Sequence, residues 1–318
     1  MRPSRLRVAA VQYPVNGGLQ FQEFMDKMED FVLSAARDGA ELVVFPELFT
    51  ADLFPPGDVQ AEIAAIDYIV HESTPRFFES VQKLSTKLKI AILAGTIPRL
   101  ADATHKKIRN TAFFSLPDGK TYFQDKIFLT TCESKDWGWE GGGVSLESPG
   151  HSPRVPLNLP LNLIDTPWGP IVISICYDTE IPLLSSLLAS QLAENFPEIF
   201  LIPSCTGSSH GFYRVRWTAQ ARAVEHYAYV IHTGTVGPGT QTPNMNTQFG
   251  QAAIITPRDE GFAGLLAEGP LQKSAIVYAD LDLDFLRSKR QKAQVYPARD
   301  QTRLIQKIIE KPTGGIIP

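Results

Sequence analysis

A thiol at the end of an apolar, β-prone run is the most reactive feature of this 318-residue sequence. Cys176 follows the run 171–175 and precedes a segment in which Pro182 is typical of a first helical turn. A helix N-terminus favours a thiolate there, because its free N–H groups and dipole stabilise an anion. Cys176 is therefore a candidate nucleophile. A small, buried apolar cysteine fits the same segment equally well.

Two charged residues also lie in or after β-prone runs. Glu47 comes directly after Pro46, which closes the run 42–45, and Lys126 lies within the run 121–129. Strand ends of α/β folds open onto ligand crevices, so a glutamate there could carry a proton, and a lysine could stabilise an oxyanion. Each also has an ordinary interpretation: a solvated surface acid for Glu47, and an edge-strand charge for Lys126.

The elements that would position these residues alternate along the chain. Strands are predicted at 6–12, 42–45, 90–97, 111–116, 121–129, 171–175, 199–202, 229–233, 252–256 and 275–280, and helices at 21–35, 75–88, 181–193 and 213–226. A loop is expected over 141–160, and a basic, polar tail after Asp284. Interleaved helices and strands without a long linker indicate one α/β domain.

Composition excludes several classes of protein. Hydrophobic residues make up 43% and charged residues 20%, which is typical of a globular chain. The net charge of −4 offers no basic excess for nucleic acid, and no apolar run approaches the length of a membrane span. Three cysteines are too few for a disulfide framework, which favours a reducing, cytoplasmic location.

The three reactive residues, in this chain order and in these contexts, resemble the nitrilase, or carbon–nitrogen hydrolase, superfamily. The contexts are FPELF around Glu47, YFQDKIFLT around Lys126 and ISICYDTEIP around Cys176. The Ser204-Cys205-Thr206 segment and the loop at Glu133 look like those of a branch of predicted bacterial amidohydrolases. The resemblance implies a four-layer αββα sandwich over residues 1–300, with a C-terminal tail at 301–318.

The resemblance also implies a catalytic triad. Glu47 would be the general base, Lys126 the transition-state stabiliser and Cys176 the nucleophile. Members carry a second glutamate on the loop after the lysine, which Glu133 fits best, with Glu140 as the alternative. The backbone N–H of Tyr177, next to the nucleophile, would help to hold the oxyanion.

A further set of residues is expected around the substrate. Cys205 and Trp137 are candidates for the pocket wall, together with His210, Trp139 and Phe212, whereas Cys132 looks incidental. A Cys–His pair using His210, His226 or His232 is the rival catalytic design. One departure from the family is the run 233–235, which has no asparagine after its strand.

The expected activity is cysteine-dependent hydrolysis of a small linear amide through a thioester, releasing ammonia and a carboxylate without metal or cofactor. Nitrile hydrolysis, N-carbamoyl hydrolysis and acyl transfer would use the same triad and remain alternatives. A binding or scaffold protein would lack a triad member, and none is missing. A homodimer or larger homo-oligomer is expected from the resemblance.

Overall fold

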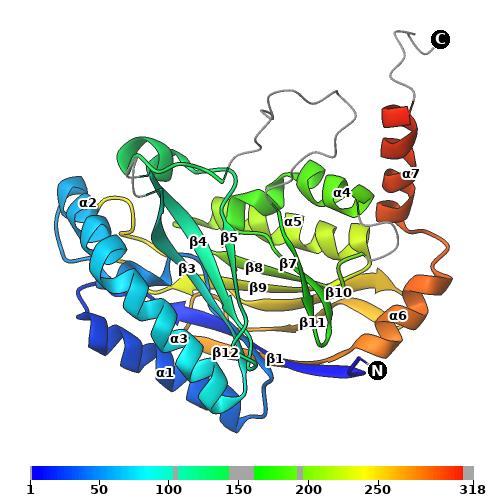
Figure 1. Ribbon diagram of the computed structural model, residues 1–318, viewed down its shortest axis with the longest axis horizontal. Coiled ribbons are helices and arrows are strands. Elements are labelled where there is room, and N and C mark those ends of the chain that lie inside the picture. Colours follow the sequence, from blue (N-terminus) through cyan, green and yellow to red (C-terminus); the bar gives the residue numbers. More distant parts are fainter. Residues whose placement is uncertain (1, 103–106, 143–160, 192–195, 311–318) are drawn as a thin grey trace.

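Twelve strands form one hydrogen-bonded array in the computed structural model, which describes residues 2–102, 107–142, 161–191 and 196–310 (Figure 1). They are β1 (Arg5–Pro14), β2 (Leu42–Val44), β3 (Ala91–Asp102), β4 (Lys107–Ser115), β5 (Thr121–Asp125), β6 (Leu163–Thr166), β7 (Gly169–Ile173), β8 (Ile199–Ser204), β9 (Tyr229–Val236), β10 (Ala253–Asp259), β11 (Phe262–Glu268) and β12 (Ala275–Asp282). The helices are α1 (Phe21–Arg37), α2 (Val59–Tyr68), α3 (Thr74–Leu88), α4 (Pro182–Gln191), α5 (Ser209–His226), α6 (Leu283–Lys292) and α7 (Pro297–Glu310).

The array consists of two halves of six strands each. One half has the order β5-β4-β3-β2-β1-β12 and the other β11-β10-β9-β8-β7-β6. They join where the last residues of β1 pair in parallel with the last residues of β9. The carboxyl ends of these two strands therefore meet at one edge of the molecule.

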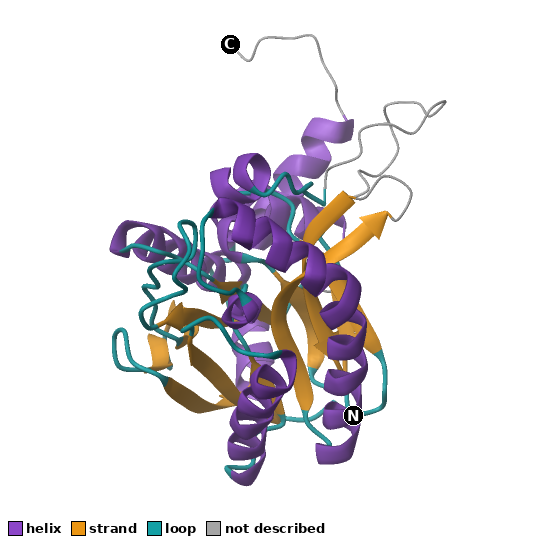
Figure 2. Cartoon of the chain, turned by 90° about the vertical axis from the view of Figure 1, so that its left-hand side faces the viewer, coloured by secondary structure: helices purple, strands orange, loops and turns teal. Residues whose placement is uncertain are grey.

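The two halves pack face to face because alternate side chains of β1 enter different cores. Leu6, Val8 and Ala10 share a core with strands of the other half, whereas Ala9 and Val11 share one with α1 and α3. Helix α5 packs on β8, β9 and β10 on the opposite side. The strands thus lie between two outer sets of helices (Figure 2), which confirms the expected four-layer sandwich in a single α/β domain.

The C-terminal region departs from the expected polar tail. Residues after Leu283 form α6 and α7, and α7 crosses residue 300 and packs against α4, where Ser186 donates a hydrogen bond to Gln301. The basic run in α6 is not simply solvated: Arg290 donates hydrogen bonds to the carbonyls of Phe196, Pro197 and Tyr227. The expectation of a tail was wrong because an arginine that bonds to carbonyls of the fold and a fully solvated one look alike in sequence.

Smaller elements were also missed by the sequence patterns. These are α2, which Asp58 caps by accepting hydrogen bonds from two N–H groups, together with β6 and β11. The expected loop at 141–160 falls mostly on residues 143–160, which lie outside the described ranges, as does the chain after residue 310. Among the described helices, none is long and apolar enough to cross a membrane.

Candidate active site

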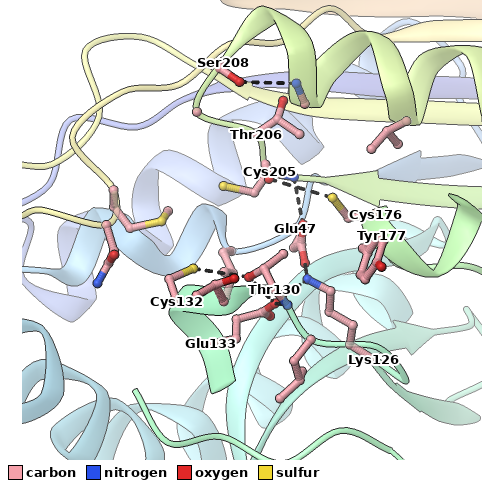
Figure 3. A pocket seen from close by; sticks show the side chains of 18 of the residues that line it. Glu47, Lys126, Thr130, Cys132, Glu133, Cys176, Tyr177, Cys205, Thr206 and Ser208 are labelled. Atoms are coloured by element: carbon pink, nitrogen blue, oxygen red, sulfur yellow. Dashed lines mark hydrogen bonds and ion pairs between the residues drawn. The ribbon is translucent and has the colours of Figure 1, made fainter. Parts of the chain in front are cut away.

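Four strands deliver the candidate residues to the same edge of the molecule. Strands β2, β7 and β8 run parallel to β1 and β9, and β5 has the same direction because two successive antiparallel pairings separate it from β3. Glu47, Lys126, Cys176 and Cys205 each follow the carboxyl end of one of these strands, so the fold gathers them around one cavity (Figure 3). Lys126 lies just past β5 rather than within a strand as expected.

The turn that carries Glu47 is held from β3. Gly95 has a positive φ of 50°, and a Cβ atom at that position would lie 2.0 Å from the Pro46 carbonyl oxygen. Only glycine permits so close an approach of the two backbones. The Leu48 N–H then donates to the Thr96 hydroxyl at 2.9 Å, which fixes the turn on the side of β3.

Glu47, Lys126 and Glu133 form what we call the buried ion cluster. The Lys126 Nζ atom lies 2.8 Å from Glu47 Oε1 and 2.6 Å from Glu133 Oε2, and each of the three residues is only 1% exposed. Glu133 therefore lies in direct contact with Lys126. The alternative, Glu140, pairs with Lys107 instead and does not line the cavity.

Further donors complete the hydrogen bonding of this cluster. The Asn110 side-chain amide donates to Glu47 Oε1 at 3.0 Å and to Glu133 Oε1 at 2.7 Å. The Thr130 N–H and hydroxyl both donate to Glu133, and the Cys205 N–H donates to Glu47 Oε2 at 2.9 Å. Buried carboxylates are stable only when paired and hydrogen-bonded in this way.

Asn110 is a functional candidate that sequence reasoning missed. It lies in β4 and is completely buried, in the run Asn110-Thr111-Ala112-Phe113-Phe114. A buried asparagine in such a run must find partners, and that was the available signal. The identity of the partners was not readable, because Glu47 is 63 residues away along the chain.

The environment shifts the pKa values of the two carboxylates of the cluster in opposite directions. Burial raises the pKa of Glu47, and the charge of Glu133 raises it further, against the opposing effect of Lys126. Burial acts on Glu133 in the same direction, but Lys126 and the hydrogen bonds from Thr130 and Asn110 lower its pKa below the ordinary value. Glu47 is thus the better proton acceptor of the pair, and Glu133 the permanent counter-charge.

The lysine keeps its charge despite its burial. Burial by itself lowers the pKa of Lys126, but the charges of Glu133 and Glu47 outweigh it and hold the pKa well above the ordinary value. Lys126 is therefore a fixed cation between two carboxylates.

Cys176 occupies a strained turn a short way past the end of β7. Its φ of 47° lies in the left-handed region, and a short 3₁₀ segment, Cys176–Glu180, follows. Such strain is typical of functional positions. The Sγ atom lies 3.8 Å from the Cys205 carbonyl oxygen.

The thiol is held in its protonated form. Burial, and then the charge of Glu47, raise the pKa of Cys176 well above its ordinary value. The helix end that follows would favour a thiolate, but desolvation and the Glu47 carboxylate act in the opposite direction. A base is needed to remove the proton.

Asp178 joins the turn at Cys176 to the residues that follow Lys126. The Ile127 and Phe128 N–H groups donate to its carboxylate at 2.8–3.2 Å. Burial raises its pKa to about 7, against the effect of these hydrogen bonds. Asp178 is two residues from Cys176 and holds the backbone next to Lys126, so it positions both.

The cavity has a volume of about 640 Å³, which suits a small organic ligand. Of the expected wall residues, Tyr177, Cys205 and Trp137 line it, and so does Cys132, which looked incidental in the sequence. His210, Trp139 and Phe212 do not line it, so their proposed pocket roles are corrected. All three cysteines of the chain thus border one cavity (Figure 3).

A buried glutamate fixes the wall at Trp137. The Trp137 indole N–H donates to Glu62 Oε2 at 2.8 Å, and the Asn244 N–H and amide donate to the same carboxylate. Asn244 also lines the cavity. Glu62 in α2, which the sequence did not single out, therefore ties two wall segments together.

The histidines do not support the rival Cys–His design. His226 and His232 are buried, and burial lowers the pKa of each to about 3. Neither of them, nor His210, lines the cavity that contains Cys176. Within the described part of the chain, no group of three or more His, Cys, Asp or Glu residues could hold a metal ion.

Comparison with known proteins identifies the class. The profile of the Carbon-nitrogen hydrolase family matches residues 7–291, and the chain belongs to this family. Among curated relatives, the probable hydrolase YhcX of Bacillus subtilis is 32% identical over 305 residues, which are 95% of this chain and 55% of that protein. The chain thus spans about half the length of that relative.

Further relatives are amidases by name. The omega-amidase NIT3 of Saccharomyces cerevisiae is 27% identical over 257 residues, covering 79% of this chain and 78% of that protein. The crystal structure of Nit3 from the same yeast, described as a member of branch 10 of the nitrilase superfamily, superposes with a TM-score of 0.69 at 25% identity. That match covers 92% of this chain and 96% of the other. An amidase from Nesterenkonia sp. shares the fold with a TM-score of 0.66 at 19% identity, over 92% of this chain and 96% of that one.

Proposed function

We propose that the protein is a cysteine-dependent hydrolase that cleaves the C–N bond of a small linear amide and releases ammonia and a carboxylate. The observation that carries this proposal is the buried ion cluster beside a protonated thiol in one cavity. The family is one of carbon–nitrogen hydrolases, and omega-amidases among the relatives favour an amide as substrate.

The first step is attack by the sulfur of Cys176 on the amide carbon. Glu47 accepts the thiol proton, since its raised pKa makes it the more basic carboxylate of the cluster. Charge develops on the substrate oxygen, where the Lys126 ammonium and the Tyr177 N–H stabilise it. Glu133 remains ionised and keeps Lys126 in place.

The second step is breakdown of the tetrahedral intermediate. Glu47 returns the proton to the leaving nitrogen, the C–N bond breaks, and ammonia departs from a thioester on Cys176. Glu47 then takes a proton from a water molecule that attacks the thioester. The carboxylate leaves and the thiol is restored. These residues perform every proton transfer, and no cofactor enters the scheme.

Ammonia release from a panel of amides, nitriles and N-carbamoyl compounds tests the reaction class. The amides are expected to be turned over fastest, and inactivity on amides beside nitrile turnover would overturn the assignment. Added hydroxylamine would be converted into a hydroxamate if the acyl group is passed to amines, which tests the acyltransferase alternative.

Intact-mass measurement of the stalled acyl-enzyme tests the nucleophile. The wild-type chain and Cys205→Ala are expected to gain the mass of the acyl group, whereas Cys176→Ala gains nothing and loses turnover. If Cys176→Ala still labels and Cys205→Ala does not, the nucleophile is Cys205. The matched cysteine control is possible because both thiols border the same cavity.

Two sequence-based expectations stay proposals. One is assembly into a homodimer or larger homo-oligomer, which light scattering of the purified protein would measure. The other is a cytoplasmic location, which fractionation of the source cells would test.

A further inference from the structure

A second pair of opposite charges borders the cavity, and the catalytic scheme does not use it. Glu180 ends the 3₁₀ segment that begins at Cys176, and Arg214 lies on α5, which packs against that segment. Arg214 Nε donates to Glu180 Oε2 at 3.1 Å, and both residues line the cavity. We call Glu180 and Arg214 the outer ion pair.

This pair is accessible to solvent, unlike the buried ion cluster. The Glu180 side chain is 15% exposed and that of Arg214 is 62% exposed. The one hydrogen bond between them uses the Arg214 Nε atom. Within the described ranges, Glu180 Oε1 and both terminal amino groups of the guanidinium have no protein partner. One acceptor and two donor groups therefore remain available to a ligand.

The cavity has room for more than an amide group. Its volume of about 640 Å³ corresponds to roughly twenty water molecules, at about 30 Å³ each. Apolar side chains also line it, namely Leu48, Leu129, Trp137, Val215 and Met245. A substrate with a short methylene chain between its amide and a polar end would use both kinds of lining.

The charges of the outer ion pair decide which polar end fits. A lone carboxylate would gain Arg214 but meet the repulsion of Glu180, and a lone ammonium would meet the reverse. An end that carries both charges places its carboxylate on the guanidinium and its ammonium on Glu180 Oε1, so that each charge faces an opposite one. Figure 3 shows Ser208 and Thr206, which precede α5, on the side of Cys205 away from Lys126 and Glu133.

We infer that the outer ion pair recognises the zwitterionic end of an α-amino acid, so that the substrate is a side-chain amide of such an acid. This inference rests on the proposed amide hydrolysis and adds its specificity. A purely structural pair would only hold α5 against the 3₁₀ segment that begins at Cys176. The experiment separates this role from substrate recognition.

Four amides with the same three-carbon chain beyond the carbonyl form the test series. L-glutamine carries both charges and butanamide carries neither. Glutaramate carries the carboxylate alone, and 4-aminobutanamide carries the ammonium alone. Wild-type kcat/KM is expected to be highest for L-glutamine. Loss of either charge should lower it about tenfold or more, the range for a hydrogen bond to a charged group.

Two variants assign each charge to its partner. Glu180→Gln should lower kcat/KM for L-glutamine to the level of glutaramate, and Arg214→Gln to the level of 4-aminobutanamide. Butanamide carries neither charge, so both variants should lower its turnover far less than that of L-glutamine, and urea unfolding shows that the variants fold. Glu79→Gln and Arg303→Gln are matched controls, because each breaks an exposed ion pair away from the cavity.

The outcomes separate this inference from the proposed function. Butanamide turnover equal to that of L-glutamine would overturn the inference and leave amide hydrolysis standing. Equal losses for all four amides in both variants would show a structural pair and also overturn it. If the four amides release no ammonia but other amides do, the inference fails. Failure of every amide, together with no acyl adduct on Cys176, would overturn the proposed function itself.

Discussion

The buried ion cluster and the outer ion pair border one cavity, yet they differ in their exposure to water and in how fully their charges are paired. Lys126 and its two carboxylates are excluded from water, and each carboxylate accepts further hydrogen bonds from neighbouring groups. Glu180 and Arg214 share a single hydrogen bond and stay accessible to solvent. The same kinds of charge are thus fully paired in one place and only partly paired in the other.

Burial explains the difference between the two sets. In the low-dielectric interior a charge without partners is very costly, so the cluster must be complete before substrate arrives. Charges that are fixed in advance can stabilise charge that develops in a transition state. At the solvent-exposed edge an incomplete pair costs little, so its free groups remain available for recognition. Fully paired charges therefore suit catalysis, and partly paired charges suit selection of the substrate.

The largest expected effect comes from breaking the buried ion cluster at its centre. Lys126→Met keeps the length of the side chain but leaves Glu47 and Glu133 without their cation. Removal of one partner from a buried pair costs about 3–5 kcal/mol, so the free energy of unfolding should fall by this amount. Turnover should be lost with it.

Urea unfolding and ammonia release measure the two effects. Lys83→Met is the control, since Lys83 pairs with Glu79 where both side chains are more than half exposed. A stability loss no larger than that of the control would contradict the view that the cluster depends on its lysine.

The sequence predicted the parts of this site that depend on strand ends. Glu47 and Cys176 each follow an apolar run, and the resemblance to a known family implied Glu133. Contacts between distant segments had no local signature. The Asn110 and Asp178 hydrogen bonds join residues 63 and about 50 positions apart. A pattern in one segment cannot show which buried partner another segment supplies.

Helix faces set a second limit on prediction. Ser208, Gly211, Arg214 and Val215 line the cavity at spacings of three and four, so one face of α5 points into it. His210 lies between them in sequence but on another face, which is why its predicted role was wrong. The order of the strands was the least readable part, because the pairing of β1 with β9 and β12 joins the two ends of the chain.

A smaller break of the cluster tests the role of its neutral donor. Asn110→Leu keeps the number of side-chain heavy atoms and the branching at Cγ but removes the hydrogen bonds to Glu47 and Glu133. Hydrogen bonds to charged groups contribute about 1.5–3 kcal/mol, so the free energy of unfolding should fall by that amount and kcat by about 10- to 100-fold.

The same two measurements apply, with Asn162→Leu as a control at an exposed position. The loss of kcat should exceed any change in KM, because the donor acts on the carboxylates of the buried ion cluster and not on the substrate. A change in KM alone would mean that Asn110 shapes the pocket rather than the cluster.

Asp178 offers a test of burial through pH. Its pKa is about 7 in the folded chain against an ordinary value of 3.8. Between these values the folded chain holds a proton that the unfolded chain has lost, so stability falls as the pH rises through this window. For one proton the slope is at most about 1.4 kcal/mol per pH unit, and it vanishes above pH 7.

Asp178→Asn removes this titration and keeps an oxygen that accepts from the Ile127 and Phe128 N–H groups. Between pH 4.5 and about 7, the urea midpoint of the wild-type protein should therefore fall relative to that of the variant. From pH 7 to 8 the difference between the two midpoints should stay constant. Parallel profiles would show that Asp178 is ionised throughout the range, and the positioning role would then rest on its hydrogen bonds alone.

The smallest expected effect comes from the outer ion pair. Ion pairs near solvent contribute about 0.2–1 kcal/mol, because water already stabilises the separate charges. Glu180→Gln should therefore lower the free energy of unfolding by less than about 1 kcal/mol, a loss well below that of Asn110→Leu. Raising the salt concentration should shrink it further, since screening weakens exposed pairs more than buried ones. A destabilisation as large as that of Lys126→Met would mean that the fold needs this pair. Glu180 and Arg214 would then be structural in the same sense as the buried ion cluster, with no free charge left to select a substrate.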